Sequence, residues 1–320
     1  MESLAREIEA SPHGLIDDYP GECFPSDVIA ALAAIRRADT LLGTDHAEFC
    51  RRALRGFQGA MVDARTGLPP YMADSKEGQI VEIRGSTSQW ACAWAPSIWP
   101  DMAQDWYQAF ETGFWQRRWG AAGFREFPRD QSRREWTFDV DAGPILGGFA
   151  LATTAFSIGA ARVNGRFDHA YPLSAETVAL SWPLPDGTLL LPRTLSSSLD
   201  APYVGEAAIL FNLTRRTPDA MPKIRGGTLP PVVFGVIGLL IVGMLVELRS
   251  ILRRLRRTEA WIGQRTFPTP RLQFALWLVI ILSGLWVFSS VHLLIGLLLI
   301  CSAQLLPTAC RRPHRNTQLP

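Results

Sequence analysis

Apolar residues in the first two thirds of the chain recur at helical spacing. A clear example is the run Val28, Ile29, Leu32 and Ile35. These positions are three and four residues apart, which predicts an amphipathic helix that begins near Ser26 and ends near Gly43. The same reasoning predicts six further helices, at residues 45–61, from 86 onward, and at 101–119, 143–163, 168–180 and 201–214.

The segments between these helices alternate between short and long. A short hairpin is expected between Gly67 and Arg84, a loop at 120–136, and strand with loop at 183–198. Helical hairpins in series with such connections build α/α toroids and α-solenoids. We therefore expect an all-α fold, namely an α/α toroid with short β-hairpin loops. An incomplete six-hairpin barrel is one form of this fold.

Two apolar stretches without Asp, Glu, Lys or Arg follow, at 226–246 and 272–310. About 20 apolar residues are needed to cross the hydrocarbon core of a bilayer, so the first stretch predicts one span. As one helix, 272–306 would be about 52 Å long, which is too long for a single crossing. A break near Ser289–His292 would divide it into a hairpin, which gives three spans in total.

These patterns divide the chain into six parts. They are a soluble domain at 1–217, a linker at 218–231, a first transmembrane helix at 232–247, a basic loop at 248–271, a transmembrane hairpin at 272–306 and a basic tail at 307–320.

Arginine placement predicts the orientation of the spans. The loop carries seven arginines against the single acid Glu259, and the tail carries Arg311, Arg312 and Arg315. Basic residues close to spans stay on the cytoplasmic side. The soluble domain is then expected outside the cytoplasm, anchored in a bacterial-type inner membrane and in contact with lipid. Because Met1–Pro20 has no apolar run that could export it, we expect a further segment upstream.

The net charge of +2 conceals this Arg-rich end, so the soluble part is acidic and nucleic acid is not an expected partner. The histidines are scattered, and the cysteines Cys23, Cys50 and Cys92 lack metal-ligand spacing. We therefore predict neither a metal nor a cofactor.

Unusual polar residues gather at the starts of alternate predicted helices. In chain order they are Tyr19, Glu22 and Asp27, then Arg84, Gln89 and Trp90, then Asp139 and Asp141, and finally Tyr203 and Glu206. In a ring of hairpins the inner helices share one direction, so their N-termini meet at one rim, where the helix dipole favours acidic groups. Each group could merely cap its helix. Together, with Arg125 and Glu126 in a long connection above the rim, they predict a shared ligand site.

The order of several short motifs is similar to that of a known family. They are Gly14–Leu15–Ile16, Gly43–Thr44–Asp45, Asp63–Gly67, Arg125–Glu126 and Asp139-x-Asp141-x-Gly143. Because of these motifs and their order, residues 14–170 resemble the α/α-toroid domain of the linalool dehydratase/isomerase-like family. That domain is similar in shape to six-hairpin glycosidases.

The resemblance implies a pair of catalytic cysteines, but the matching positions hold Asp17 and Ser26, with Cys23 between them. Cysteine chemistry therefore does not carry over. The family's toroid also begins several helices before Met1, which implies that an upstream segment, a second copy or another partner completes the ring.

Three functions fit this pattern. The first is an enzyme of the glycoside-hydrolase type, in which one carboxyl group protonates a leaving oxygen and another activates water or stabilises a cation on a saccharide substrate. The second is a lyase or isomerase that dehydrates a small alcohol, as the resemblance implies. The third is a non-catalytic, membrane-anchored binding domain.

For either enzyme the same side chains are candidates. The catalytic set is Glu22, Asp27, Glu126, Asp139, Asp141 and Glu206. The expected substrate-binding set is Tyr19, Arg84, Gln89, Trp90, Arg125 and Tyr203.

Overall fold

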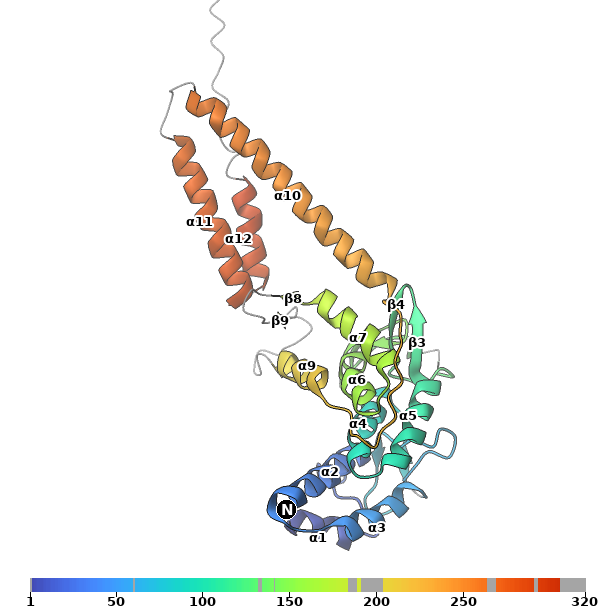
Figure 1. Cartoon of the computed structure of the whole chain (residues 1–320). Coiled ribbons are helices and arrows are strands. Elements are labelled where there is room, and N and C mark those ends of the chain that lie inside the picture. The colour runs from blue at the N-terminus through green and yellow to red at the C-terminus, as the bar shows by residue number, and fades with distance from the viewer. Residues whose placement is uncertain are drawn as a thin grey trace, which may run out of the picture. The chain divides into compact units, whose positions relative to one another are not determined.

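The computed structural model describes residues 2–59, 61–131, 134–140, 142–183, 189–190, 204–263, 269–290 and 293–305 (Figure 1). It divides into two compact units. The first comprises Met1–Ala179 and Glu206–Gly235, and the second comprises Leu180–Gly205 and Val236–Pro320. Most of the described chain is helical, as the apolar spacing predicts.

The helices of the first unit follow the predicted order, apart from α1, which was not predicted. They are α1 (Glu2–Ala10), α2 (Pro25–Leu42), α3 (Ala47–Phe57), α4 (Gly85–Trp94), the 3₁₀ turn η1 (Ala95–Ser97), α5 (Pro100–Phe114), α6 (Leu151–Val163), α7 (Phe167–Leu180) and α9 (Val204–Thr214). Helix α4 packs against α2 on one side and α6 on the other. The helices α2, α4 and α6 are thus neighbours in series, while closure into a toroid stays a prediction.

Small residues allow this close packing of α4 and α6. The buried side of α4 carries Ser88, Ala91, Cys92 and Ala93, and that of α6 carries Ser157, Gly159, Ala160 and Ala161. Large side chains come from α5, where Trp106, Phe110 and Phe114 fill the core. The N-termini of the two small-residue helices are thereby fixed next to each other.

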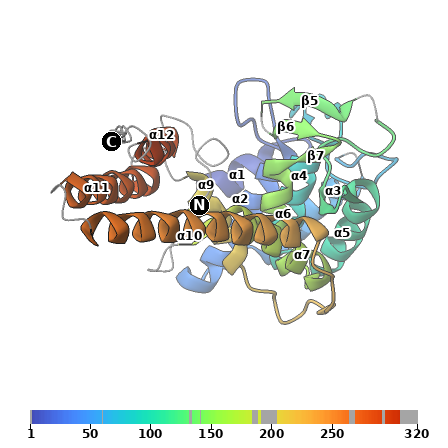
Figure 2. The same ribbon diagram turned by 90° about the horizontal axis from the view of Figure 1, so that it is seen from above.

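Short strands connect the helices. They are β1 (Met72–Ala73) with β2 (Ile80–Val81), β3 (Trp115–Arg118) with β4 (Ala121–Phe124), the sheet of β5 (Trp136–Asp139), β6 (Gly143–Leu146) and β7 (Phe149–Ala150), and β8 (Trp182–Pro183) with β9 (Leu189–Leu190). All pairs are antiparallel. Figure 2 shows the three-stranded sheet beside α4 and α6. The hairpin predicted between Gly67 and Arg84 is confirmed.

Three sequence-based boundaries are wrong. The helix predicted at 101–119 ends at Phe114, and the loop predicted at 120–136 contains β4, because Trp119 and Gly120 form a tight turn with positive φ at both residues. The helix predicted from 143 begins at Leu151, because Gly147 and Gly148 also have positive φ and turn β6 back into β7. Of the segment predicted at 183–198, the structure describes Pro183 and β9.

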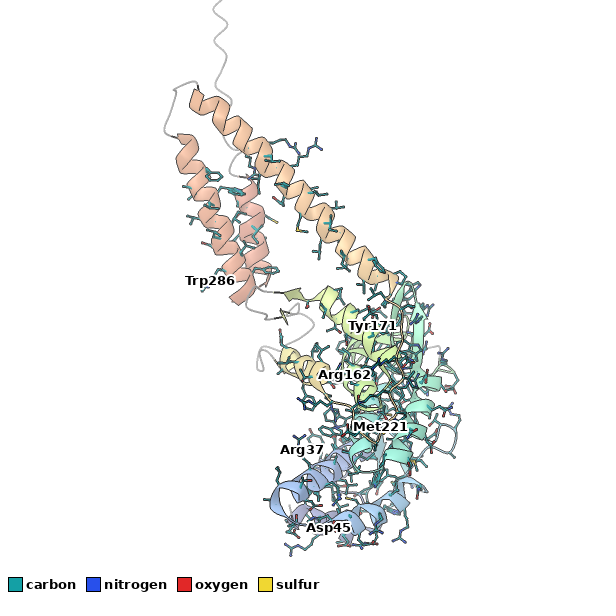
Figure 3. All side chains as sticks on the ribbon, viewed as in Figure 1. Arg37, Asp45, Arg162, Tyr171, Met221 and Trp286 are labelled. Atoms are coloured by element: carbon teal, nitrogen blue, oxygen red, sulfur yellow. The ribbon has the colours of Figure 1, made fainter. Side chains whose placement is uncertain are left out.

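The predicted linker at 218–231 packs onto the first unit. Met221 is buried in its core (Figure 3). The Ile224 carbonyl accepts a hydrogen bond from the Phe167 amide at 2.9 Å, and the Ile224 amide donates to the Gly165 carbonyl at 2.8 Å. The segment is therefore held on the turn between α6 and α7.

Three apolar helices follow, α10 (Pro231–Gly263), α11 (Thr269–Ser290) and α12 (Leu293–Leu305). The start of α10, up to Gly235, belongs to the first unit, and the rest of α10 belongs with α11 and α12 to the second unit. Among the described residues one helical segment, Pro231–Arg254, is long and apolar enough to cross a membrane. Helix α10 continues to Gly263, so the first part of the predicted basic loop is helical.

Of the break predicted near Ser289–His292, Ser289 and Ser290 form the end of α11, and residues 291 and 292 lie outside the described residues. Helices α11 and α12 are packed against each other. The two helices pack closely where small residues meet larger ones. A Cβ at Gly296 would lie 2.4 Å from the Cα of Phe288, and one at Gly284 would lie 2.8 Å from Ile300. Two further spans stay a prediction.

Candidate functional site

Arg84 immediately precedes α4 and joins three segments. Its Nε donates to Glu82 Oε1 at 2.6 Å and its Nη1 to Asp139 Oδ2 at 2.9 Å. The guanidinium carbon lies 3.8 Å from the centre of the Tyr71 ring. Only 15% of the Arg84 side chain and 10% of the Asp139 side chain are exposed, so this ion pair is largely shielded from water.

Glu126 lies beside this pair, in the connection that follows β4. Its Oε1 accepts from the Ser86 hydroxyl at 2.6 Å, and its Oε2 accepts from the Ser86 amide at 3.1 Å and from the Thr153 hydroxyl at 2.5 Å. Ser86 is in the first turn of α4 and Thr153 in the first turn of α6. Glu126 therefore bridges the N-termini of two neighbouring helices.

The protonation of Glu126 is unusual. Its carboxyl group is fully buried, and burial raises its pKa to about 7, with the negative charge of Asp139 adding to the rise. The hydrogen bonds from Ser86 and Thr153 and the charge of Arg84 act in the opposite direction. A pKa close to neutral is suited to a group that gives up and regains a proton.

The start of α2 is joined to the same region through aromatic rings. The Trp90 side chain of α4 lies close enough to the Asp27 carboxylate to lower its pKa. The Tyr19 and Phe24 rings are edge-on, with their centres 6.4 Å apart, and the centres of the Phe24 and Tyr71 rings are 5.4 Å apart. Since Tyr71 stacks on Arg84, three of the four predicted clusters form one connected surface over α2, α4 and β5.

Asp27 is a second group with a raised pKa. More than a third of its side chain is exposed, yet desolvation by the surrounding protein raises its pKa, followed by the nearby charge of Asp18, while the Trp90 side chain lowers it. Unlike Glu126, Asp27 can contact a ligand directly.

Other predicted residues lie in different settings. Glu22 and Tyr19 are exposed, and their backbones form a turn in which the Glu22 amide donates to the Tyr19 carbonyl at 2.9 Å. Gln89 is buried within α4. Arg125 is also buried, and its guanidinium donates to Gln116 Oε1 at 3.0 Å and to Glu135 Oε1 at 2.9 Å. Arg125 therefore supports the β strands from within.

The fourth predicted cluster is described in part. Glu206 lies half-buried in the first turn of α9. Asp141 and Tyr203 lie outside the described residues, so their proposed roles stay predictions.

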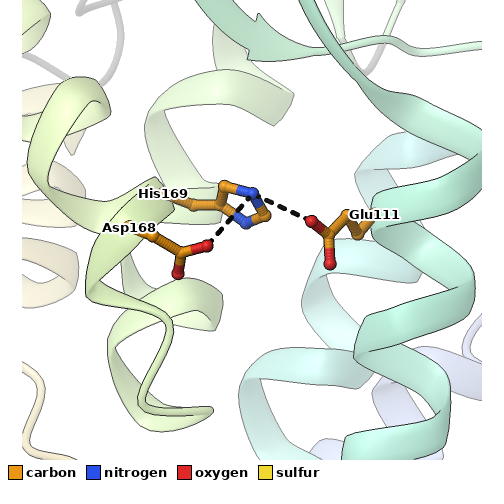
Figure 4. A group of neighbouring side chains, drawn as sticks. All are labelled: Glu111, Asp168 and His169. Atoms are coloured by element: carbon orange, nitrogen blue, oxygen red, sulfur yellow. Dashed lines mark ion pairs between the residues drawn. The ribbon is translucent and has the colours of Figure 1, made fainter. Parts of the chain in front are cut away.

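Glu111, Asp168 and His169 form a further polar group, between α5 and α7, with ligand atoms within 4.8 Å of one another (Figure 4). The Arg166 guanidinium donates to both Glu111 oxygens, at 2.5 and 2.8 Å, and to Asp168 Oδ2 at 2.8 Å. The positively charged guanidinium of Arg166 therefore lies where a metal cation bound by these residues would lie. The contacts favour a partly buried ion-pair network that joins α5 to α7, rather than a metal centre.

Sequence reasoning missed several partners of the site, namely Tyr71, Glu82 and Thr153. Ser86 was part of a predicted polar cluster, because it follows Arg84 and Gly85 at a helix start. Thr153 lies in an apolar helix and Glu82 in a short hairpin, and neither position differs in pattern from an ordinary surface or core residue. Comparison with models of known protein families and with curated protein sequences finds no match to this chain.

Proposed function

We propose that the first unit is an enzyme that cleaves a C–O bond by carboxylate acid/base chemistry at the N-termini of α4 and α6. One observation carries the proposal. Glu126, whose pKa is raised to about 7, is hydrogen-bonded to the Ser86 hydroxyl beside the Arg84–Asp139 ion pair. Two neighbouring carboxyl groups in environments this different can serve as acid and base.

In this proposal Glu126 supplies the proton through Ser86. With Glu126 protonated on Oε1, that O–H donates to Ser86 Oγ across the same 2.6 Å contact. The half-buried Ser86 hydroxyl then gives its own proton to the leaving oxygen as the C–O bond breaks, and takes the Glu126 proton. Asp139, positioned by Arg84, accepts a proton from the attacking water, whose oxygen forms the new bond to carbon. Solvent then returns that proton to Glu126. Asp27 is the alternative acid for a substrate that reaches the start of α2.

The aromatic residues favour a saccharide as the substrate. Phe24 and Trp90 are half-buried beside the carboxyl groups, and Tyr19 is 64% exposed. Aromatic rings combined with a few polar groups are typical of binding sites for partly apolar ligands, and sugar rings have such apolar faces. The activity is thus of the glycoside-hydrolase type.

The test uses the full chain in detergent and two substrate panels, nitrophenyl glycosides and small tertiary alcohols. Glu126→Gln and Asp139→Asn should each lower turnover by about a hundred-fold while the protein stays folded. Glu176→Gln is the matched control, because burial also raises the pKa of Glu176 to about 7, but this residue lies on α7 and accepts from the Ala122 amide.

Wild-type rates in both amide variants would contradict the proposal. Turnover of the alcohols alone would favour a dehydratase. Sugar binding without any turnover would indicate a non-catalytic binding domain.

The membrane placement is part of the same proposal. Helix α10, with α11 and α12 as a second and third span, anchors the enzyme in a bacterial-type inner membrane. The arginines that follow the first span support a cytoplasmic position for that end, so the first unit faces an extracytoplasmic substrate.

A further inference from the structure

The β3–β4 turn carries a large aromatic residue in a conformation that disfavours it. Trp119 has φ 53° and Gly120 has φ 76°. A two-residue hairpin turn with positive φ at both positions prefers Asn or Gly, and a bulky side chain there is strained. The turn itself does not need tryptophan, so the side chain is explained by what it contacts.

One face of Trp119 packs on a second hairpin turn. A Cβ at Gly147, in the β6–β7 turn, would lie 2.0 Å from Trp119 Cη2. The Trp136 ring of β5 lies 5.6 Å from that of Trp119, and Leu146 pairs with Trp136 in register. The side chains of Trp119 and Trp136 are nevertheless 61% and 63% exposed, and that of Leu146 is 49% exposed. We call Trp119, Trp136 and Leu146 the aromatic platform.

The platform is continuous with the start of the apolar helix. The Val232 amide donates to the Gly120 carbonyl at 2.9 Å, and Pro231 lies against Gly120, 3.1 Å from where a Cβ would be. Figure 1 shows β3 and β4 at the beginning of α10. Pro231 is also the first residue of the segment that is long and apolar enough to cross a membrane. Trp119 therefore lies beside the first residues of this apolar segment, at the level where the segment would enter a bilayer.

The charges beside the platform suit a lipid surface. Arg117 and Arg118 are exposed on β3. Arg118 stacks on Trp119, with its guanidinium carbon 4.4 Å from the ring centre, and it shares Glu135 with the buried Arg125. Arg117 donates to the Thr228 hydroxyl at 2.7 Å, close to the start of α10. Tryptophan is enriched at membrane interfaces, and arginine binds the phosphates of anionic lipids.

We infer that the aromatic platform, with Arg117 and Arg118, rests on the lipid headgroups around the start of α10 and fixes the first unit against the membrane surface. The inference rests on α10 crossing the bilayer and is independent of the proposed chemistry. The occupant of this surface is the bilayer itself, because the platform is joined to the helix that enters it.

The test places a nitroxide label at Leu146→Cys in the full chain, with the exposed Cys301 and also Cys310 replaced by serine. Cys23, Cys50 and Cys92 are buried. Leu41→Cys is the matched control, since Leu41 is a 79% exposed leucine at the end of α2. Each nanodisc holds one chain in three parts phosphatidylcholine to one part phosphatidylglycerol. Collision of the label with a water-soluble nickel complex is measured.

We expect the label at Leu146 to be several-fold less accessible to nickel than the label at Leu41. The double variant Trp119→Asn, Trp136→Thr should remove this protection, and both substitutions suit the local backbone, a left-handed turn and a strand. Equal accessibility of the two labels would overturn the inference, and so would protection that survives the double variant. Protection that appears only in discs with two chains would indicate a contact between copies and would also overturn it.

Discussion

Two buried carboxyl groups of the first unit, those of Glu126 and Asp39, are driven in opposite directions by their neighbours. Glu126 accepts hydrogen bonds from two hydroxyls and one amide, and its burial raises its pKa to about 7. Asp39 is also desolvated, but hydrogen bonds from His46, Thr44 and Arg36 outweigh this and hold its pKa well below its usual range. Similar burial therefore leaves one group ready to carry a proton and the other firmly ionised.

The raised pKa of Glu126 predicts a pH dependence of stability. The native state binds its proton up to about pH 7, whereas the unfolded chain releases it near 4.5. Stability should therefore fall as pH rises through this window, by about 3 kcal/mol in total. In Glu126→Gln this contribution is absent.

Urea unfolding of wild type and Glu126→Gln between these two pH values measures the difference. As pH rises, the free energy of unfolding of the wild type should fall relative to that of the variant. Parallel curves would mean that Glu126 titrates normally in the folded protein.

The Asp39–His46 pair makes a second residue-scale prediction. His46 Nδ1 lies 2.6 Å from Asp39 Oδ1, and the pKa of His46 is raised chiefly by this hydrogen bond. The stability that His46 contributes to the folded protein is complete below about pH 6.5 and is lost as pH rises through the raised pKa of His46. The stability that Asp39 contributes is present above about pH 3.8 and is lost as pH falls through the lowered pKa of Asp39.

Asp39→Asn should lower the free energy of unfolding by about 2 kcal/mol near pH 6, because it weakens charge-assisted hydrogen bonds to a buried group. Asp45→Asn is the control. Asp45 contacts the same Arg36 but its side chain is 79% exposed, so its loss should change stability by less than about 0.5 kcal/mol. Equal effects of the two substitutions would refute the special role of Asp39.

Several residues of the site could be predicted from the sequence because they occupy helix starts and the connections between helices. Asp27, Arg84, Glu126 and Asp139 were found in this way, and the structure brings the last three together. Thr153 could not be found, because nothing in an apolar helix distinguishes a threonine that faces a buried carboxyl group. For Arg125 the sequence is misleading in another way. A charged residue in a loop is normally exposed, yet Arg125 is only 5% exposed.

At the scale of elements, helices were easier to predict than short strands. Helix α2 follows its apolar spacing from end to end, whereas β3 is four residues long and continues directly from α5. Its sequence, Trp115 to Arg118, has the same mixture of apolar and polar residues as the helix before it. The spacing of Asp45 and Glu48 at the start of the helix predicted at 45–61 is typical of a capping box. In the structure Asp45 instead pairs with Arg36 and accepts from the Ala47 amide, while Glu48 pairs with Arg51.

The junction of α4 with the segment after β4 predicts the effect of a single methyl group. A Cβ at Gly85 would lie 2.0 Å from the Arg125 carbonyl oxygen, and the Gly85 amide donates to the Glu126 carbonyl at 2.7 Å. Gly85→Ala should therefore destabilise the protein by about 3 kcal/mol and displace Glu126.

Gly113→Ala is the matched control in helix α5, since no atom lies within 4 Å of its added Cβ. There the substitution should stabilise the protein by up to about 1 kcal/mol. Thermal unfolding measures both variants. If Gly85→Ala is as stable as Gly113→Ala, the helix start is not packed as described.

At the scale of the whole molecule, the apolar segments were predicted from length and composition alone. Among the described residues, Pro231–Arg254, which contains the first predicted span, is long and apolar enough to cross a membrane, while α10 extends beyond the predicted span to Gly263. The ring could not be predicted to close, because closure depends on contacts between helices far apart in sequence, which periodicity does not encode. Where the first unit lies relative to the membrane is a question of topology.

We expect the first unit to lie outside the cytoplasm. Protease added to cells whose outer membrane has been made permeable should digest it, while protease added to inverted vesicles, whose cytoplasmic face is outside, should reach the arginines after Val246. Full protection of the first unit in the permeabilised cells, together with its digestion in inverted vesicles, would show the reverse orientation.

The pH dependence of turnover tests the assignment of acid and base most directly. With the substrate that the panels identify, kcat/KM of the wild type should fall as pH rises above about 7, since the proton of Glu126 is lost there. Glu176→Gln should keep this descending limb, and the residual rate of Glu126→Gln should not show it. A wild-type profile that is flat across neutral pH, or a descending limb that remains in Glu126→Gln, would contradict the proposal that Glu126 is the acid.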